Sequence, residues 1–337
     1  WIEPAPPPSV GCDLIYEVSR LLKRGKILAL KDQRAFRLIA RADDDAVVQR
    51  LQRRQEWSGT PVGLMVRDLE MAHRVAVLDE QSEEQLRAVS SPRVIVPFRP
   101  DAPVAARLRE LAEVELMLTP EPVYEVLFGD LADELATPLI AIPAQVGVDA
   151  PVRDNEEARR ILRDVVDYLV LHDLVLFPCT EDWVVRVVDS EPVVLRRSGA
   201  DTDIPLPLPD RAPQVIALGC SSEATAAAAL PDCIRMGPFV GELDSERAVE
   251  QFGRTARRLL ELFEGEPEFV TYDPVCRARF STVLRSIDAE PVPVDHHHAH
   301  VAAVMAEHAM LGPVLGLALD GPAPVVDADL GRAVILE

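Results

Sequence analysis

The chain lacks several features that would direct it to a membrane, to nucleic acid or to the secretory route. No apolar run approaches the ~18 residues that a membrane span requires. The formal net charge is −21, and phosphate recognition needs a basic patch, so nucleic-acid binding is disfavoured and the charge is read as an aid to solubility. The proline-rich residues 1–8 contain no basic region followed by an apolar core, so they do not read as a secretory signal.

Cysteine is also scarce. The five cysteines are scattered, odd in number and contain no CxxC pair. Such a set predicts reduced, buried structural thiols in a cytoplasmic protein rather than a disulfide framework. The residues concerned are Cys12, Cys179, Cys220, Cys233 and Cys276.

The length of 337 residues predicts two domains, because a single core rarely grows that large. Mixed helix and strand patterns precede residues 205–209, where alternating prolines read as a linker. Before the linker, apolar spacing predicts a long amphipathic helix from Asn155 to Leu171. Beyond it, strands alternate with helices, which favours a three-layer α/β lobe. The predicted domains are 13–209 and 210–337.

Histidine is concentrated in one place. Four of the seven histidines lie within residues 296–300, at the start of an apolar helix pattern. On that helix, His296 and His300 share one face, and two imidazoles at this spacing form half of a divalent-metal site. An affinity tag is disfavoured because the run is internal and interrupted by Ala299. A solvated, polar helix start remains an open alternative.

Residues 293–308 carry this cluster, and together with residues 312–321 they resemble the histidine signature of the HypF family of carbamoyltransferases. Several segments of the first domain resemble the YrdC-like domain of the same family. These segments are 61–69, 91–93, 153–158, 171–173, 182–189 and 195–197. The resemblance covers nearly all of residues 13–337.

This resemblance implies an α/β fold in which a YrdC-like twisted mixed-sheet domain (13–209) precedes a partial actin-like (ASKHA) α/β domain (210–337, first lobe only). It also implies a two-step chemistry. The first domain makes carbamoyl adenylate from ATP and carbamate, with Mg²⁺ as the accompanying ion. The second passes the carbamoyl group to the terminal cysteine of HypE, or to another maturation partner, as in nickel–iron hydrogenase maturation. The oligomeric state is left open.

The resemblance also assigns site residues. Basic side chains in the first domain are expected to meet the nucleotide phosphates: Lys31, Arg53, Arg54, Arg196 and Arg197. The expected ligands of a divalent metal, zinc or iron, are His296, His300 and Asp320. The alternative is that these arginines are surface residues that no longer bind phosphate.

The chain departs from the family in its ligand loops. The family has glycines after its first lysine, whereas residues 31–36 contain none, and Asp32 adds a charge expected to repel phosphate. The family's Thr-Ser-Gly-Asn nucleotide loop is replaced by residues 142–145, and prolines stand at 322 and 324 where a glycine-rich loop is expected.

Three hypotheses follow. The chain is a HypF-like carbamoyltransferase, it is a catalytically degenerate relative that acts as a partner-binding scaffold, or it is a metal-binding module that uses the histidines alone. Losses concentrated in ligand loops lean towards impaired catalysis, because chemistry depends on sites rather than on folds.

Overall fold

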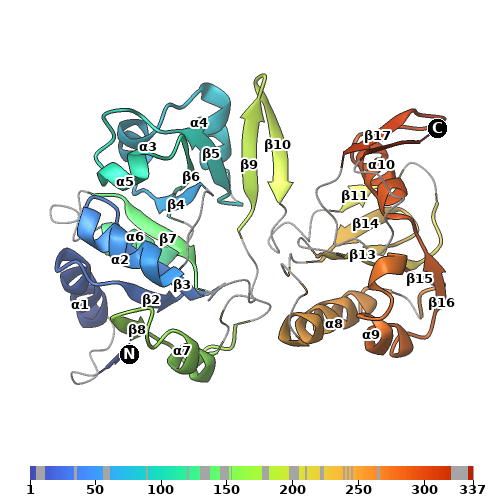
Figure 1. Cartoon of the computed structure of the whole chain (residues 1–337), viewed down its shortest axis with the longest axis horizontal. Coiled ribbons are helices and arrows are strands. Elements are labelled where there is room, and N and C mark those ends of the chain that lie inside the picture. Colours follow the sequence, from blue (N-terminus) through green and yellow to red (C-terminus); the bar gives the residue numbers. More distant parts are fainter. Residues whose placement is uncertain are drawn as a thin grey trace. The chain divides into compact units, whose positions relative to one another are not determined.

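The computed structural model divides the chain into two compact units, Trp1–Ala200 and Asp201–Glu337 (Figure 1). The structure describes residues 1–4, 12–33, 36–55, 61–88, 90–119, 121–129, 137–144, 152, 154–176, 182–196, 205–208, 211–220, 224–237, 240, 243, 246–263, 266–319 and 333–336. None of the described helices is long and apolar enough to cross a membrane.

The first unit is built on a ten-stranded mixed sheet with the order β1-β8-β2-β3-β7-β4-β6-β5-β9-β10. Its strands are β1 (Ile2–Glu3), β2 (Leu28–Lys31), β3 (Phe36–Arg41), β4 (Val62–Met65), β5 (Arg93–Pro97), β6 (Glu113–Met117), β7 (Leu139–Pro143), β8 (Tyr168–Val170), β9 (Val184–Val188) and β10 (Glu191–Arg196). Its helices are α1 (Cys12–Lys23), α2 (Asp45–Gln55), α3 (Leu69–Val75), α4 (Glu80–Leu86), α5 (Ala106–Arg109), α6 (Pro122–Phe128) and α7 (Asn155–Ile161).

Helices cover both faces of this sheet. Along β2, Leu28 and Leu30 join an apolar cluster that also contains residues of α1 and α6, whereas Ala29 joins a second cluster with residues of α2 and α3. Alternate side chains of a strand point to opposite faces, so the two clusters lie on the two sides of the sheet. The near-continuous apolar strands of the sequence follow from this double burial.

The long helix predicted for residues 155–171 is wrong in its second half. Helix α7 ends at Ile161, and β8 follows as a parallel neighbour of β2. The Asp167 carboxylate accepts a hydrogen bond from the backbone N–H of Ile27 (2.8 Å), which fixes the start of the strand. Helical spacing of apolar residues continued into β8, but pairing inside the sheet overrides local preference there.

The second unit contains a six-stranded sheet of order β11-β14-β13-β12-β15-β16 and a two-stranded sheet, β17-β18. Its strands are β11 (Leu206–Pro207), β12 (Val215–Leu218), β13 (Ala226–Ala229), β14 (Cys233–Met236), β15 (Phe269–Tyr272), β16 (Glu290–Pro293), β17 (Gly316–Leu319) and β18 (Ala333–Leu336). Its helices are α8 (Glu246–Leu260), the 3₁₀ turn η2 (Pro274–Cys276), α9 (Ser281–Arg285) and α10 (His296–Glu307).

The mixed α/β class predicted for both parts of the chain is confirmed, and the second sheet also contains an antiparallel pair, β13 and β14, that was not predicted. The alanine-rich β13 has low strand propensity, so it gave no sequence signal. Residues 206–207 of the predicted linker pair with β14. Strands β12, β15 and β16 run parallel to one another, so their carboxyl ends meet at one edge of the sheet.

Candidate functional site

Helix α10 presents the histidines at its first turn. Its N-cap is Asp295, whose carboxylate accepts hydrogen bonds from the backbone N–H groups of His297 (3.0 Å) and His298 (3.3 Å). These amides have no partner within the helix, so the cap fixes where the helix begins. The helix therefore starts at His296, in agreement with the sequence prediction.

The imidazoles of His296 and His300 converge. Their Nε2 atoms are 3.1 Å apart and their ring centroids 4.6 Å apart. A zinc ion with tetrahedral ligands at about 2.0–2.1 Å places two ligand nitrogens about 3.3 Å from each other. The separation thus fits two ligands of one metal ion, and the predicted pair is brought together.

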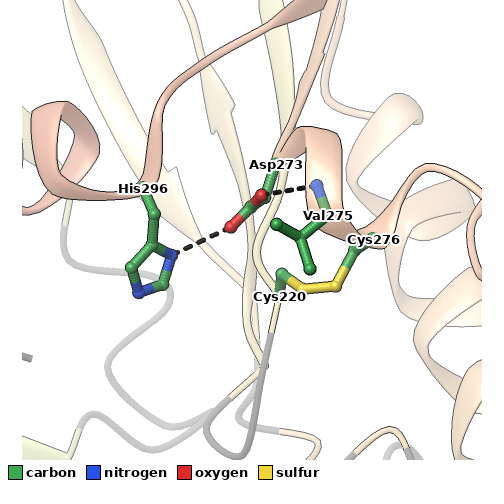
Figure 2. Close-up of a disulfide and its surroundings, with 5 residues drawn as sticks. All are labelled: Cys220, Asp273, Val275, Cys276 and His296. Atoms are coloured by element: carbon green, nitrogen blue, oxygen red, sulfur yellow. Dashed lines mark hydrogen bonds and ion pairs between the residues drawn. A yellow bond between two sulfur atoms is a disulfide. The ribbon is translucent and has the colours of Figure 1, made fainter. Parts of the chain in front are cut away.

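Asp273 holds His296 in place from the other side. Its Oδ2 lies 3.0 Å from His296 Nδ1, and its Oδ1 accepts a hydrogen bond from Val275 N (2.8 Å) (Figure 2). Because a carboxylate only accepts, this contact favours the tautomer with the proton on Nδ1, which leaves Nε2 as an acceptor facing Nε2 of His300. Sequence reasoning missed Asp273, although an Asp-Pro pair directly after an apolar strand is a turn signal.

The histidine pair is only half of a metal site. Within the described ranges, no group of three His, Cys, Asp or Glu side chains is placed to hold a metal ion. The third predicted ligand, Asp320, lies outside the described residues. The two imidazoles, one of them oriented by a carboxylate, are donors that suit a divalent metal.

Cys220 and Cys276 form a disulfide, so the prediction of reduced thiols is wrong for this pair. They follow neighbouring parallel strands, β12 and β15, in which Leu218 is paired with Tyr272. The shared edge brings the two Cα atoms to 6.2 Å despite 56 residues of sequence separation. Cys233 is a free thiol. Strand pairing, which the sequence alone did not reveal, decides this contact.

In the first unit, Lys31 is buried and fully engaged. Its ammonium donates to Asn155 Oδ1 (3.1 Å) and to the carbonyl oxygens of His172 (3.1 Å) and Leu174 (2.6 Å). An ammonium has three N–H donors, so none is left over for a phosphate. Burial lowers the Lys31 pKa, an effect opposed by the charges of Asp154 and Asp173.

The predicted phosphate-binding arginines contact different parts of the unit. Arg53 is exposed at the end of α2. Arg54 donates to the carbonyl oxygen of Val165 (2.7 Å), and Arg196 donates to that of Asp182 (3.1 Å). Arg197 lies outside the described residues. Arg54 and Arg196 therefore donate hydrogen bonds to backbone groups of the chain itself.

A buried charge cluster occupies the face of the sheet nearest α6. Arg37 donates two bonds to the carboxylate of Asp182, one of them at 2.6 Å, and Arg93 Nε donates to the same carboxylate (2.7 Å). Burial opposes ionisation of Asp182, but the two guanidinium groups outweigh it and hold its pKa well below the usual range. An added Cβ at Gly63 would overlap the Arg93 guanidinium, so glycine is needed there.

Asp32 belongs to the same cluster. Its carboxylate accepts from Arg37 Nε (2.6 Å) and from the Tyr124 hydroxyl (2.9 Å), and the group is buried. The expectation that Asp32 presents a repelling charge to phosphate is corrected, because the charge is balanced by Arg37. Sequence reasoning missed this cluster, although an arginine inside a buried apolar strand implies a paired carboxylate.

Two family models match the chain. One is described as the HypF Kae1-like domain and matches residues 210–307. The other is described as telomere recombination, covers the Sua5, YciO and YrdC proteins, and matches residues 20–198.

Curated relatives match nearly the whole chain. It is 33% identical to carbamoyltransferase HypF of Rhizobium leguminosarum bv. viciae over 91% of its own length and 41% of that protein. Against carbamoyltransferase HypF of Rhodobacter capsulatus the identity is 30%, over 95% of this chain and 44% of the relative. The chain thus spans about two fifths of the relatives it matches.

Solved structures agree. Full-length HypF in its phosphate- and nucleotide-bound form superposes with a TM-score of 0.85 at 26% identity, over 95% of this chain and 42% of that one. HypF of T. kodakarensis gives the same TM-score at 25% identity, over 93% of this chain and 41% of that one.

Proposed function

Because the chain belongs to the HypF family, with its YrdC/Sua5 domain and its Kae1-like region, we propose that it takes part in carbamoyl transfer. The proposed reactions are ATP-dependent formation of carbamoyl adenylate and transfer of the carbamoyl group to a protein or small-molecule acceptor. A HypE-like protein in the cytoplasm is the proposed acceptor, with hydrogenase maturation as the setting. We assign residues 13–209 to the first step and residues 210–337 to the second.

The observation that carries this proposal is the histidine pair held by Asp273. Nε2 of His296 and of His300 are 3.1 Å apart, and Asp273 fixes the tautomer of His296. A zinc or iron ion bound there supplies Lewis-acid polarisation of a carbonyl oxygen. The chain's own contribution is to hold both nitrogens ready, with Asp320 proposed as the third ligand.

The metal site is tested by His296→Ala combined with His300→Ala. We expect the double variant to lose stoichiometric Zn²⁺ binding in equilibrium dialysis while its far-UV circular dichroism is unchanged, because both side chains lie at the surface end of α10. His298→Ala is the matched control, since His298 is an exposed neighbour on the same turn. Full metal loading of the double variant would show that these histidines are not the site.

A second candidate is a partner-binding scaffold without adenylation activity, and the state of Lys31 favours it. All three N–H donors of the ammonium already bind groups of the chain. A phosphate would have to displace one of them, so we expect ATP affinity weaker than micromolar. Like the role of Lys31, phosphate binding by Arg53, Arg54, Arg196 and Arg197 remains a proposal.

ATP–pyrophosphate exchange separates the two candidates. The purified chain receives carbamate from carbamoyl phosphate through a separate acylphosphatase. Exchange above a no-enzyme control, lost in Lys31→Ala and retained in the control Arg99→Ala, whose exposed side chain is assigned no role in nucleotide binding, supports carbamoyl-adenylate formation at Lys31. Absence of exchange from a chain that calorimetry shows to be folded contradicts the enzyme reading, and a pull-down of partner proteins then tests the scaffold.

A further inference from the structure

The disulfide is linked to the histidine pair by an unbroken series of short contacts. Cys276 is the last residue of η2, and its backbone N–H donates to the carbonyl oxygen of Asp273 (3.0 Å). The Asp273 carboxylate caps the same turn through Val275 N (2.8 Å) and holds His296 (3.0 Å). The sulfur bond therefore anchors the turn that orients His296 (Figure 2).

Cys220 is tied to the sheet on the opposite side of this bond. The N–H of the preceding residue, Gly219, donates to the carbonyl oxygen of Thr225 (3.0 Å). A Cβ added at Gly219 would overlap that same oxygen, so the backbone approaches closely. With the bond closed, η2 is fastened covalently to the hairpin of β12 and β13; with it open, η2 is held by its turn contacts and by the packing of Cys276 in the core.

The two bonded cysteines differ in exposure. Cys276 is 5% exposed and packs in the apolar core of the second unit, whereas Cys220 is half-buried. Thiol–disulfide exchange requires an incoming thiolate to reach one sulfur in line with the bond. Cys220 is the more exposed of the two residues, so we expect attack at its sulfur, with Cys276 as the leaving group.

We infer that Cys220–Cys276 is a redox-modification site, opened by a dithiol reductant, whose state sets how firmly Asp273 positions His296. Disulfides in a reducing compartment are usually transient and redox-sensing, which fits a bond beside a ligand pair rather than in a disulfide framework. The effect on metal affinity rests on the metal site proposed above; the redox site itself does not.

The exchange balances as a two-electron reaction. A thiolate of the reductant forms a bond to the Cys220 sulfur and displaces Cys276 as a thiolate, which takes up a proton. The second thiol of the reductant then attacks the mixed disulfide and releases Cys220 as a thiol. The reductant leaves as a disulfide, and two electrons and two protons have passed to the protein.

The redox site is tested by counting thiols in the full chain. Native protein is treated with dithiothreitol, desalted under nitrogen, denatured and alkylated, and its mass is compared with that of untreated protein. We expect two additional alkylated cysteines after reduction, none in Cys220→Ala/Cys276→Ala, and two in Cys233→Ala, whose thiol is outside the bond. An unchanged count in the wild type, with peptide mapping that finds both cysteines already reduced, overturns the proposal.

The coupling is tested by Zn²⁺ titration without free thiols at the site. A carboxylate that hydrogen-bonds a metal-binding histidine typically contributes about 10–100-fold to metal affinity, so the loss in Asp273→Ala gives the largest effect expected at this site. We expect Cys220→Ala/Cys276→Ala to weaken Zn²⁺ binding by roughly 3–10-fold relative to Cys233→Ala, because the turn is loosened but Asp273 is retained. Equal affinities would contradict the coupling.

A metal-free readout keeps the outcomes separate. Amide hydrogen exchange in the peptide spanning 269–280 is compared in oxidised and reduced wild-type protein. We expect exchange to be faster by at least about tenfold after reduction, because local opening frees the Val275 amide from Asp273. The metal proposal is tested separately, by Zn²⁺ binding to the variant that combines His296→Ala with His300→Ala. Unchanged amide hydrogen exchange after reduction contradicts the redox proposal whether or not the metal site is confirmed.

Discussion

At the scale of single residues, Asp182 is the buried counter-charge that two arginines share. Arg37 and Arg93 are each 2% exposed and lie on strands whose neighbouring residues are apolar. Burying an arginine is tolerated only when it is paired. The three side chains, with Asp32 and Glu115, therefore form one unit whose members depend on one another.

The corresponding prediction concerns Asp182→Asn. Removing one partner of a buried ion pair costs about 3–5 kcal/mol, and we expect a loss of this size in the unfolding free energy of the first unit at pH 7. Asp101→Asn is the control, because Asp101 and its partner Arg99 are exposed and such pairs contribute at most about 1 kcal/mol. A loss no greater than that of the control would contradict the buried-pair reading.

The pH dependence follows from the same carboxylate. The pKa of Asp182 is held below its usual value in the folded chain, so its contribution to stability is complete above the unfolded pKa of about 3.9. The contribution is lost as the pH falls through that value towards the folded pKa. Urea unfolding between pH 7 and pH 3 therefore shows a steeper loss for the wild type than for Asp182→Asn.

At the scale of elements, sequence periodicity indicated mixed helix and strand content in both domains but not the pairing of the strands. The start of α10 was predicted correctly from the apolar helix pattern that follows the histidines, whereas its N-cap, Asp295, was not predicted. Strand β6 and the hairpin of β13 and β14 were not predicted, since short or alanine-rich strands carry weak signals. Asp273 and the disulfide depend on the adjacency of β12 and β15, which is a property of the sheet and not of local sequence.

At the scale of the molecule, each apolar cluster draws its residues from one unit. Two clusters belong to residues 1–200, and the third lies between Ile216 and Ile287. Such units are expected to unfold as separate cooperative transitions. The chain offers a selective probe, because all three tryptophans (Trp1, Trp57 and Trp183) belong to the first unit.

This separation predicts a selective effect of reduction. In the chain-entropy view, a bond that closes a loop of 56 residues stabilises the folded state by about 4 kcal/mol. We expect dithiothreitol to lower the urea midpoint of the second unit, followed by far-UV circular dichroism, and to leave the tryptophan-fluorescence midpoint unchanged. We expect Asp182→Asn to lower the tryptophan-fluorescence midpoint and to leave the midpoint of the second unit unchanged. If reduction and Asp182→Asn each shift both midpoints together, the two units unfold as one, and the stability of the redox site cannot be separated from that of the buried charge cluster.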